Sequence, residues 1–75
     1  MASIKPIHYR KLCKIFEKDG WKFSHQKGDH LIYQKPGSLR PVVIPLYKEI
    51  PTFVIFNNLR TAGISREKYF KLLGE

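Results

Sequence analysis

The residues of this sequence best suited to chemistry are its histidines, because an imidazole can accept or donate a proton near neutral pH. One of them, His30, directly follows the turn-forming residues Lys27, Gly28 and Asp29. This order predicts a histidine held at the start of a β-strand, beside a fixed positive charge. Such a side chain could transfer protons in a reaction, or it could be an ordinary solvent-exposed residue.

Histidine beside lysine and arginine suits the cleavage of RNA, which carries its own nucleophile in the 2′-hydroxyl. A base must remove the 2′ proton, an acid must protonate the leaving 5′ oxygen, and cations must stabilise the phosphorane between them. No covalent enzyme residue is needed. Histidine, lysine and arginine side chains can supply all of these functions.

Other kinds of site find little support in the sequence. His8, His25 and His30 lack the short spacings of a zinc site, and the acidic residues are scattered. No glycine-rich phosphate loop follows a strand, and neither serine nor cysteine stands in a nucleophile motif. We therefore expect no metal ion and no cofactor, and the sequence argues against nucleotide hydrolysis and acyl transfer.

The charge of the chain predicts a polyanionic partner. Fourteen Lys and Arg against six Asp and Glu give a net charge of +8 over 75 residues, spread along the chain, which is typical of nucleic-acid binding. A chain of this length predicts one domain, residues 1–75, with a thin core and a site on its surface. No apolar run is long enough for a membrane span and no signal pattern opens the chain, so a cytoplasmic protein without a membrane partner is expected. The single cysteine, Cys13, fits that expectation.

The elements that position these residues follow from hydrophobic periodicity. Between Pro6 and Gly20, apolar residues at helical spacing predict an amphipathic helix that ends at the glycine. They are Tyr9, Leu12, Cys13 and Phe16.

From Trp21 the period changes to two, which predicts a strand. Trp21, Phe23 and His25 are expected on one side, with Lys22, Ser24 and Gln26 on the other. The turn at residues 27–29 predicts an antiparallel return strand, His30–Gln34, and the β-branched run predicts a third strand, Arg40–Ile44.

Two helices are predicted to complete the chain. Thr52 is the expected N-cap of the first, which buries residues at helical spacing and stops at Gly63. Its expected apolar face consists of Ile55, Phe56, Leu59 and Ala62. Ser65 is expected to cap the last helix, with Tyr69, Phe70 and Leu73 as its apolar edge. The order α-β-β-β-α-α predicts an α+β fold in which helices cover one face of an antiparallel three-stranded sheet.

Several short motifs occur in an order that resembles the HicA family of small mRNA-interferase toxins. The family pattern consists of a Gly-aromatic start, a Gln-Lys-Gly-Ser-His hairpin, a Val-x-x-Pro strand end and a Leu-Arg-x-Ala-Gly-Ile helix exit. The matching residues are Gly20-Trp21, Gln26 to His30, Tyr33, Pro36-Gly37, Val43-Ile44-Pro45, Thr52, Leu59 to Ile64 and Phe70. The resemblance covers nearly the whole chain.

The resemblance implies a double-stranded-RNA-binding-domain-like fold, translation-independent cleavage of mRNA, and neutralisation by a HicB-type antitoxin. His30 matches the catalytic histidine of the family and Gly28 its hairpin glycine. The sequence departs from the pattern at Asp29, where serine is usual, and at Tyr47, where many members have a second histidine.

The site expected from the sequence thus contains His30 as the proton-transfer group, with basic residues that would bind RNA around it. Those RNA-binding residues are Lys22, Lys27, Gly28 and Arg40. The general acid is left open between Lys27, Tyr47 and His25. A module of the same fold that binds RNA without cutting it is the alternative, and a module that binds only an acidic protein is a third possibility.

Overall fold

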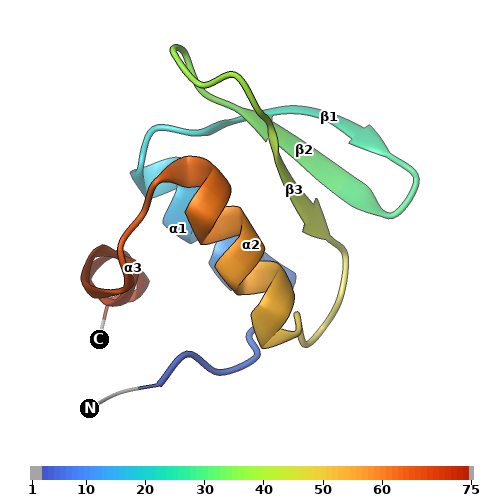
Figure 1. Cartoon of the computed structure of the whole chain (residues 1–75). Helices are drawn as coiled ribbons and strands as arrows, with labels where there is room; N and C mark the ends of the chain where they lie inside the picture. The colour runs from blue at the N-terminus through green and yellow to red at the C-terminus, as the bar shows by residue number, and fades with distance from the viewer. Residues whose placement is uncertain (1–2, 75) are drawn as a thin grey trace.

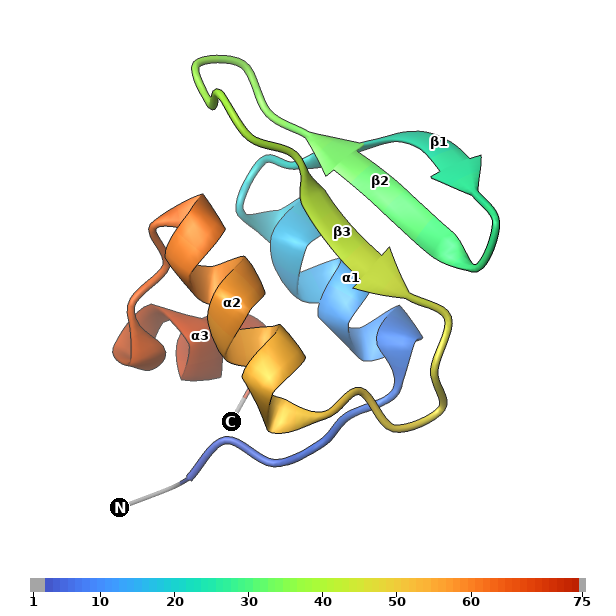
Figure 2. The same cartoon turned by 45° about the vertical axis from the view of Figure 1, so that its right-hand side comes forward.

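The computed structural model describes residues 3–74 and has the predicted α+β architecture. Within those residues the chain forms α1 (Tyr9–Lys18), β1 (Lys22–Lys27), β2 (His30–Gln34), β3 (Val42–Pro45), α2 (Thr52–Ala62) and α3 (Arg66–Leu73). The strands make one antiparallel sheet in the order β1-β2-β3. Helices α1 and α2 pack on one side of this sheet, as Figures 1 and 2 show. The predicted fold class and element order are confirmed.

The first helix begins at a histidine that the sequence did not mark as a cap. Nδ1 of His8 accepts a hydrogen bond from the backbone N–H of Arg10 at 3.1 Å. This bond satisfies one of the free N–H groups at the start of α1. The helix ends as predicted, because Gly20 adopts a φ of +97° that other residues avoid. His8 therefore has a structural contact of its own, apart from the sheet.

The first strand differs from the predicted simple alternation. Trp21 lies outside β1 and is buried, and the pairing with β2 shifts by one residue between Phe23 and His25. Ser24 is the extra residue of this β-bulge, and an extra residue reverses the alternation of side chains beyond it. The prediction that Phe23 and His25 share a face is therefore wrong.

The same bulge separates the residues predicted on the opposite side. Lys22 pairs with Gln34 before the bulge, whereas Gln26 pairs with Leu31 after it. Gln34 and Leu31 are an odd number of residues apart in β2, so they point to opposite faces of the sheet. Lys22 and Gln26 consequently lie on opposite faces, which also corrects the prediction.

The third strand is shifted along the chain from its predicted position. It spans Val42–Pro45 rather than Arg40–Ile44, and the residues before it belong to the long connection from β2. Proline fits here because β3 is an edge strand, where a missing N–H costs no interstrand bond. Asn58 of α2 is buried, and its Nδ2 donates to the carbonyl oxygen of Val43 at 3.1 Å. This bond fastens α2 to the edge strand.

The second helix corrects two predictions. Its N-cap is Pro51, not Thr52, and no side chain caps it. The carbonyl of Pro51 instead accepts from the N–H of Val54 at 3.1 Å. Phe56, expected in the core, is 45% exposed, because the buried side of α2 is centred on Ile55, Asn58 and Leu59. The predicted stop at Gly63 is confirmed.

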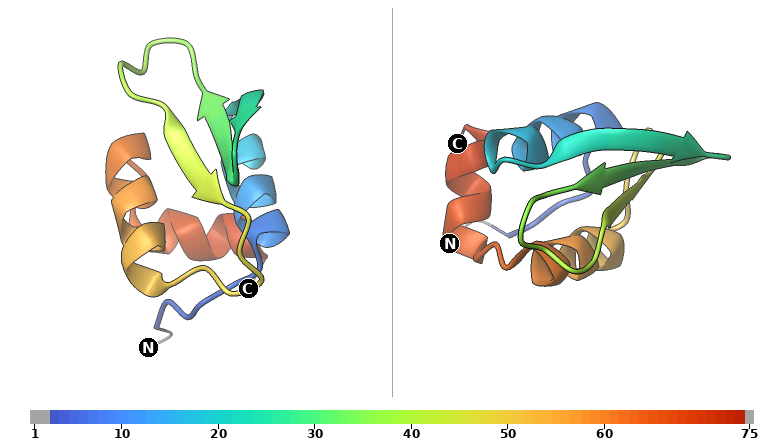
Figure 3. Two further views of the ribbon diagram at one scale, coloured as in Figure 1. Left: turned by 90° about the vertical axis from the view of Figure 1, so that its right-hand side faces the viewer. Right: turned by 90° about the horizontal axis from the view of Figure 1, so that it is seen from above.

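The last helix lies across one end of the domain and begins at the predicted cap. Oγ of Ser65 accepts from the N–H of Lys68 at 3.1 Å. Lys68 also donates to Asp19 at the end of α1, with a distance of 2.6 Å between Nζ and Oδ1. In a second contact, Nζ of Lys18 donates a hydrogen bond to the carbonyl oxygen of Leu72 at 2.9 Å. These contacts join the end of α1 to α3, which lie near each other in Figure 3.

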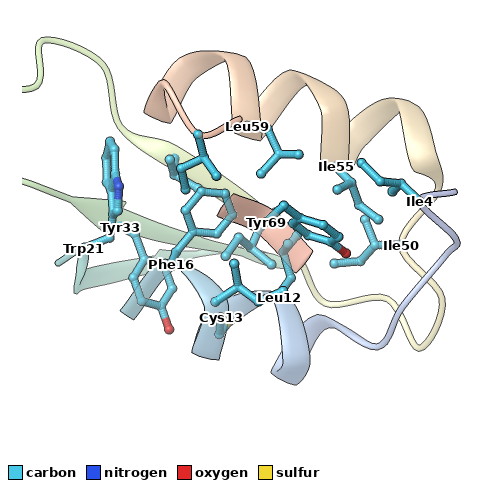
Figure 4. Close-up of a cluster of buried hydrophobic side chains, with 14 residues drawn as sticks. Ile4, Leu12, Cys13, Phe16, Trp21, Tyr33, Ile50, Ile55, Leu59 and Tyr69 are labelled. Atoms are coloured by element: carbon cyan, nitrogen blue, oxygen red, sulfur yellow. The ribbon is translucent and has the colours of Figure 1, made fainter. Parts of the chain in front are cut away.

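The core lies between the sheet and the helices, as Figure 4 shows. It is made of apolar side chains from all the elements except β1, because every residue of β1 is exposed. The largest fully buried side chains are Trp21, Tyr69, Phe16, Leu12, Ile15, Ile44, Ile50, Ile55 and Val42. The β1–β2 turn therefore projects beyond the packed part of the domain (Figure 1). None of the helices described between residues 3 and 74 has the length and apolar character needed to cross a membrane.

Candidate functional site

The alternation along β2 divides its side chains between a covered and an open face. Tyr33 is buried against α1, where its hydroxyl donates to Oε2 of Glu17 at 2.9 Å. His30 and Ile32 point the other way, because side chains alternate along a strand. The face of the sheet that carries His30 and Ile32 is called the open face below.

His30 occupies the end of the open face nearest the β1–β2 turn. It pairs with Lys27 of β1 and with Pro45 of β3, and its side chain is exposed. Side chains of directly opposed residues in antiparallel strands have Cβ atoms about 4.5–5.5 Å apart. The expectation that Lys27 lies beside His30 is therefore met.

The turn that carries His30 is fixed by its backbone. Gly28 has a φ of +58°, the conformation that a two-residue hairpin loop with glycine in its first central position requires. Nε2 of Gln26 donates to the Gly28 carbonyl at 3.0 Å, and the N–H of Leu46 donates to the carbonyl of Asp29 at 2.9 Å. The second bond anchors the turn to the chain that leaves β3. The turn before His30 is therefore held by hydrogen bonds from β1 and from the residue after β3.

A second row of side chains continues the open face next to His30. Ile32 pairs with His25 on one side and with Val43 on the other. Ile32 and Val43 are half-buried and form an apolar floor, whereas His25 is exposed. A shallow depression lies over this floor. It is lined by Lys27, Gly28, Asp29, His30, Ile32 and Val43.

The predicted RNA-binding residues fall into two groups. Lys27 and Gly28 line the depression around His30, whereas Lys22 and Arg40 line another depression at the far end of the hairpin. Lys27 lies five positions after Lys22 along β1, which corresponds to roughly 16 Å at 3.3 Å per residue. The sequence-based prediction of one basic cluster around His30 therefore needs correction.

The far depression combines positive charge with exposed apolar surface. It lies where β1 begins and where β2 leads into the connection to β3, and Leu39 in this connection is fully exposed. Its lining residues are Lys22, Phe23, Ser24, Gln34, Lys35, Pro36, Ser38, Leu39, Arg40 and Pro41. Cations and apolar groups in one depression can contact the phosphates and bases of a single-stranded nucleic acid.

Tyr47 lies just beyond the end of β3 and is half-exposed. Its backbone is held by two bonds, since its N–H donates to the carbonyl of Pro45 at 2.8 Å and its carbonyl accepts from the N–H of Tyr9 at 3.1 Å. The candidate acids Lys27 and His25 occupy regular strand positions on the open face, whereas Tyr47 does not.

Asp19 and Cys13 have shifted pKa values and structural roles. Burial would raise the pKa of Asp19, but the hydrogen bonds and charges of Lys68 and Lys35 together outweigh it and hold the pKa below its ordinary value. Burial raises the pKa of the Cys13 thiol, so this cysteine is not an activated nucleophile. No group of three or more His, Cys, Asp or Glu side chains in the described part of the chain could hold a metal ion.

Two side-chain contacts were not predicted from the sequence. Oγ of Ser24 lies 3.0 Å from Nδ1 of His25, and nothing in the period of the strand marked Ser24 as a bulge residue. The carboxylate of Asp19 also accepts from Nε1 of Trp21 at 3.2 Å. In the sequence, Asp19 stands one residue before Gly20, which ends the helix. This position could have indicated a side-chain contact at the end of the helix.

Fold and site together define a small basic α+β domain that presents an exposed histidine and lysine on an open sheet. The family model described as "HicA toxin of bacterial toxin-antitoxin" matches residues 9–64, which is most of the chain. This chain belongs to the HicA family of toxins from bacterial toxin–antitoxin systems. A search of curated proteins found no match.

Proposed function

We propose that this HicA-family toxin is a metal-independent, translation-independent endoribonuclease that cleaves mRNA, with His30 as a proton-transfer group. The observation that supports this most directly is the pairing of His30 with Lys27 at an exposed, backbone-anchored hairpin end. The imidazole can move a proton, and the ammonium can stabilise the negative charge that develops on the phosphate. Because the nucleophile comes from the RNA, the exposed surface needs no nucleophilic side chain.

The two depressions support an extended RNA substrate. Lys27 and Gly28 would contact the phosphate at the cleavage site, and Lys22 and Arg40 would contact the strand further along. Their separation of roughly 16 Å corresponds to a few nucleotides of an extended strand. An open sheet face can bind such a strand, whereas a deep pocket would exclude it.

A toxin of a toxin–antitoxin system has an antitoxin partner, and we propose a HicB-type antitoxin that covers the open face. Exposed charges around His30 and the net charge of +8 favour an acidic partner surface. The apolar floor of Ile32 and Val43 offers a place for an aromatic or aliphatic anchor. We propose that the toxin acts in the cytoplasm, where mRNA and a newly made antitoxin are both present.

The test is an assay of purified toxin with end-labelled RNA, read on a denaturing gel and by mobility shift. Discrete cleavage products that are absent with His30→Ala would support the proposal. A shift without products would instead identify a non-catalytic RNA-binding module of the same fold. If the protein neither binds nor cleaves RNA, it is an interaction module whose charge recognises an acidic protein.

A further inference from the structure

We propose that His25 is the general acid of the RNA cleavage, acting with His30 as the general base. This inference rests on the proposed function and assigns the one proton-transfer step that the sequence leaves open. It is derived from the β-bulge in β1, because a regular strand starting at the buried Trp21 would have turned His25 toward the helices.

The strand register places both histidines on the open face. His25 pairs with Ile32, and Ile32 follows His30 by two residues in β2, so all three side chains project from the same side of the sheet. His25 and His30 are therefore diagonal neighbours on adjacent strands, about 7–8 Å apart, with their Cβ atoms somewhat closer. Two imidazole rings at this separation can reach opposite sides of one phosphate group.

Lys27 completes the arrangement. It lies two residues after His25 on β1 and directly opposite His30, so its ammonium group can approach the same phosphate from between the two rings. A cation in this position stabilises the two negative charges of a phosphorane. Asp29 in the turn also lies at this end of the open face, whereas Lys22 lies at the far end of the hairpin. The helices pack on the covered face of the sheet.

Ser24 is the positioning residue for His25. Its Oγ lies 3.0 Å from Nδ1 of His25, and the serine hydroxyl can accept from Nδ1–H or donate to a bare Nδ1. The contact orients the ring in both protonation states and leaves Nε2 to exchange protons with the substrate. A general acid needs this kind of support, because its N–H must be aimed at the leaving oxygen.

The reaction balances with these two groups. Neutral His30 takes the proton of the 2′-hydroxyl while the 2′ oxygen forms a bond to phosphorus. The bond between phosphorus and the 5′ oxygen breaks, and protonated His25 gives its proton to that oxygen. The products are a 2′,3′-cyclic phosphate and a 5′-hydroxyl end, with His30 protonated and His25 neutral. Exchange with solvent restores both rings.

The decisive experiment compares two RNA substrates that differ only in the leaving atom. In one the 5′ bridging atom is oxygen, and in the other it is sulfur, which leaves as a thiolate without needing a proton because thiols are far more acidic than alcohols. His25→Ala should slow cleavage of the oxygen substrate by about 10²–10⁴-fold, and the sulfur substrate should recover most of this loss. His30→Ala should slow both substrates to the same extent.

The pH dependence gives a second measurement. The wild-type rate should rise and then fall with pH, because one histidine must be neutral and the other protonated. His25→Ala should lose the fall at high pH, and His25→Gln, which keeps a polar side chain of similar size, should behave like His25→Ala. Ser24→Ala should have a smaller defect on the oxygen substrate, and Ser24→Thr should restore the rate.

Two outcomes would overturn the inference while leaving the proposed function intact. In the first, His30→Ala is inactive but His25→Ala cleaves the oxygen substrate within about threefold of wild type, far from the usual loss of an acid catalyst. In the second, sulfur fails to rescue His25→Ala but rescues Tyr47→Phe or Lys27→Ala, which would transfer the role to that residue. A wild-type protein that does not cleave RNA would refute the proposed function itself. Thermal melts should show that every variant is folded.

Discussion

Lys27 and His30 are directly opposed residues at the closed end of the β1–β2 hairpin, and both side chains are exposed. This position lies outside the packed core, so either residue can be changed without leaving a cavity. We expect His30→Ala to lower RNA cleavage by about 10²–10⁴-fold with little change in RNA affinity or thermal stability. A rate within about threefold of wild type would exclude His30 as a proton-transfer group.

Removing divalent ions should leave cleavage unchanged. The proposed mechanism uses the 2′-hydroxyl of the substrate and protein side chains alone, so excess chelator has nothing to remove. Products should carry 2′,3′-cyclic phosphate ends, identified by mass spectrometry, and a 2′-deoxy residue at the cleavage site should block the reaction. Products with 3′-hydroxyl ends, or activity that disappears with chelator, would point to a divalent-ion mechanism.

Expression of the toxin alone should arrest bacterial growth, and co-expression of its antitoxin should restore it. The rate of association should fall as salt is raised, because exposed charges steer the encounter and salt screens them. Replacing Lys27 with glutamine should weaken this salt dependence. A purified complex that degrades RNA as fast as the free toxin would show that the antitoxin does not cover the open face.

Asp19 should be the acidic residue whose replacement lowers stability most, because its side chain is 4% exposed and its carboxylate accepts from three other residues. Lys68, Lys35 and Trp21 all donate to it. Asp19→Asn should destabilise the fold by about 1.5–3 kcal/mol in urea denaturation, the range for a hydrogen bond to a charged group. Glu67→Gln is the matched control, since Glu67 is an exposed acid on α3, and its effect should be close to zero.

The lowered pKa of Asp19 also predicts how stability depends on pH. A carboxyl group whose pKa is lower in the folded state contributes stability above its unfolded pKa of about 4, and this contribution disappears as pH falls through the folded value. The difference in unfolding free energy between wild type and Asp19→Asn should therefore shrink below about pH 4. A difference that stays constant between pH 7 and pH 3 would contradict the assignment.

Tyr33 predicts a loss of stability at high pH. Burial, together with the contacts to Cys13 and Glu17, raises the pKa of the Tyr33 hydroxyl well above its ordinary value. A group with a raised pKa contributes stability below its unfolded pKa of about 10, and this contribution falls as pH rises further. Tyr33→Phe should cost about 0.5–1.5 kcal/mol at neutral pH and should be less sensitive to alkali, as measured by denaturation at pH 8 and pH 11.

Periodicity and turn chemistry in the sequence were enough to determine the order of elements and the position of His30. The change from helical to alternating spacing near Gly20 is a local property, and so is the glycine that makes the turn before His30. Local backbone preferences act over a few residues, which is why these predictions are confirmed. The family motifs are also read in sequence order, so the match to the toxin family requires no tertiary information.

The tertiary structure decided which of the chemically capable side chains share a face. A bulge at Ser24 transfers His25 to the open face, and a simple period of two cannot show this because the extra residue appears only when β1 is paired with β2. The separation of Lys22 from Lys27 likewise depends on pairing along the whole hairpin. Asp19 at the end of α1 is a similar case, since Lys35 and Lys68 reach it from distant parts of the sequence. Contacts of this kind are set by packing between elements, which local sequence patterns do not encode.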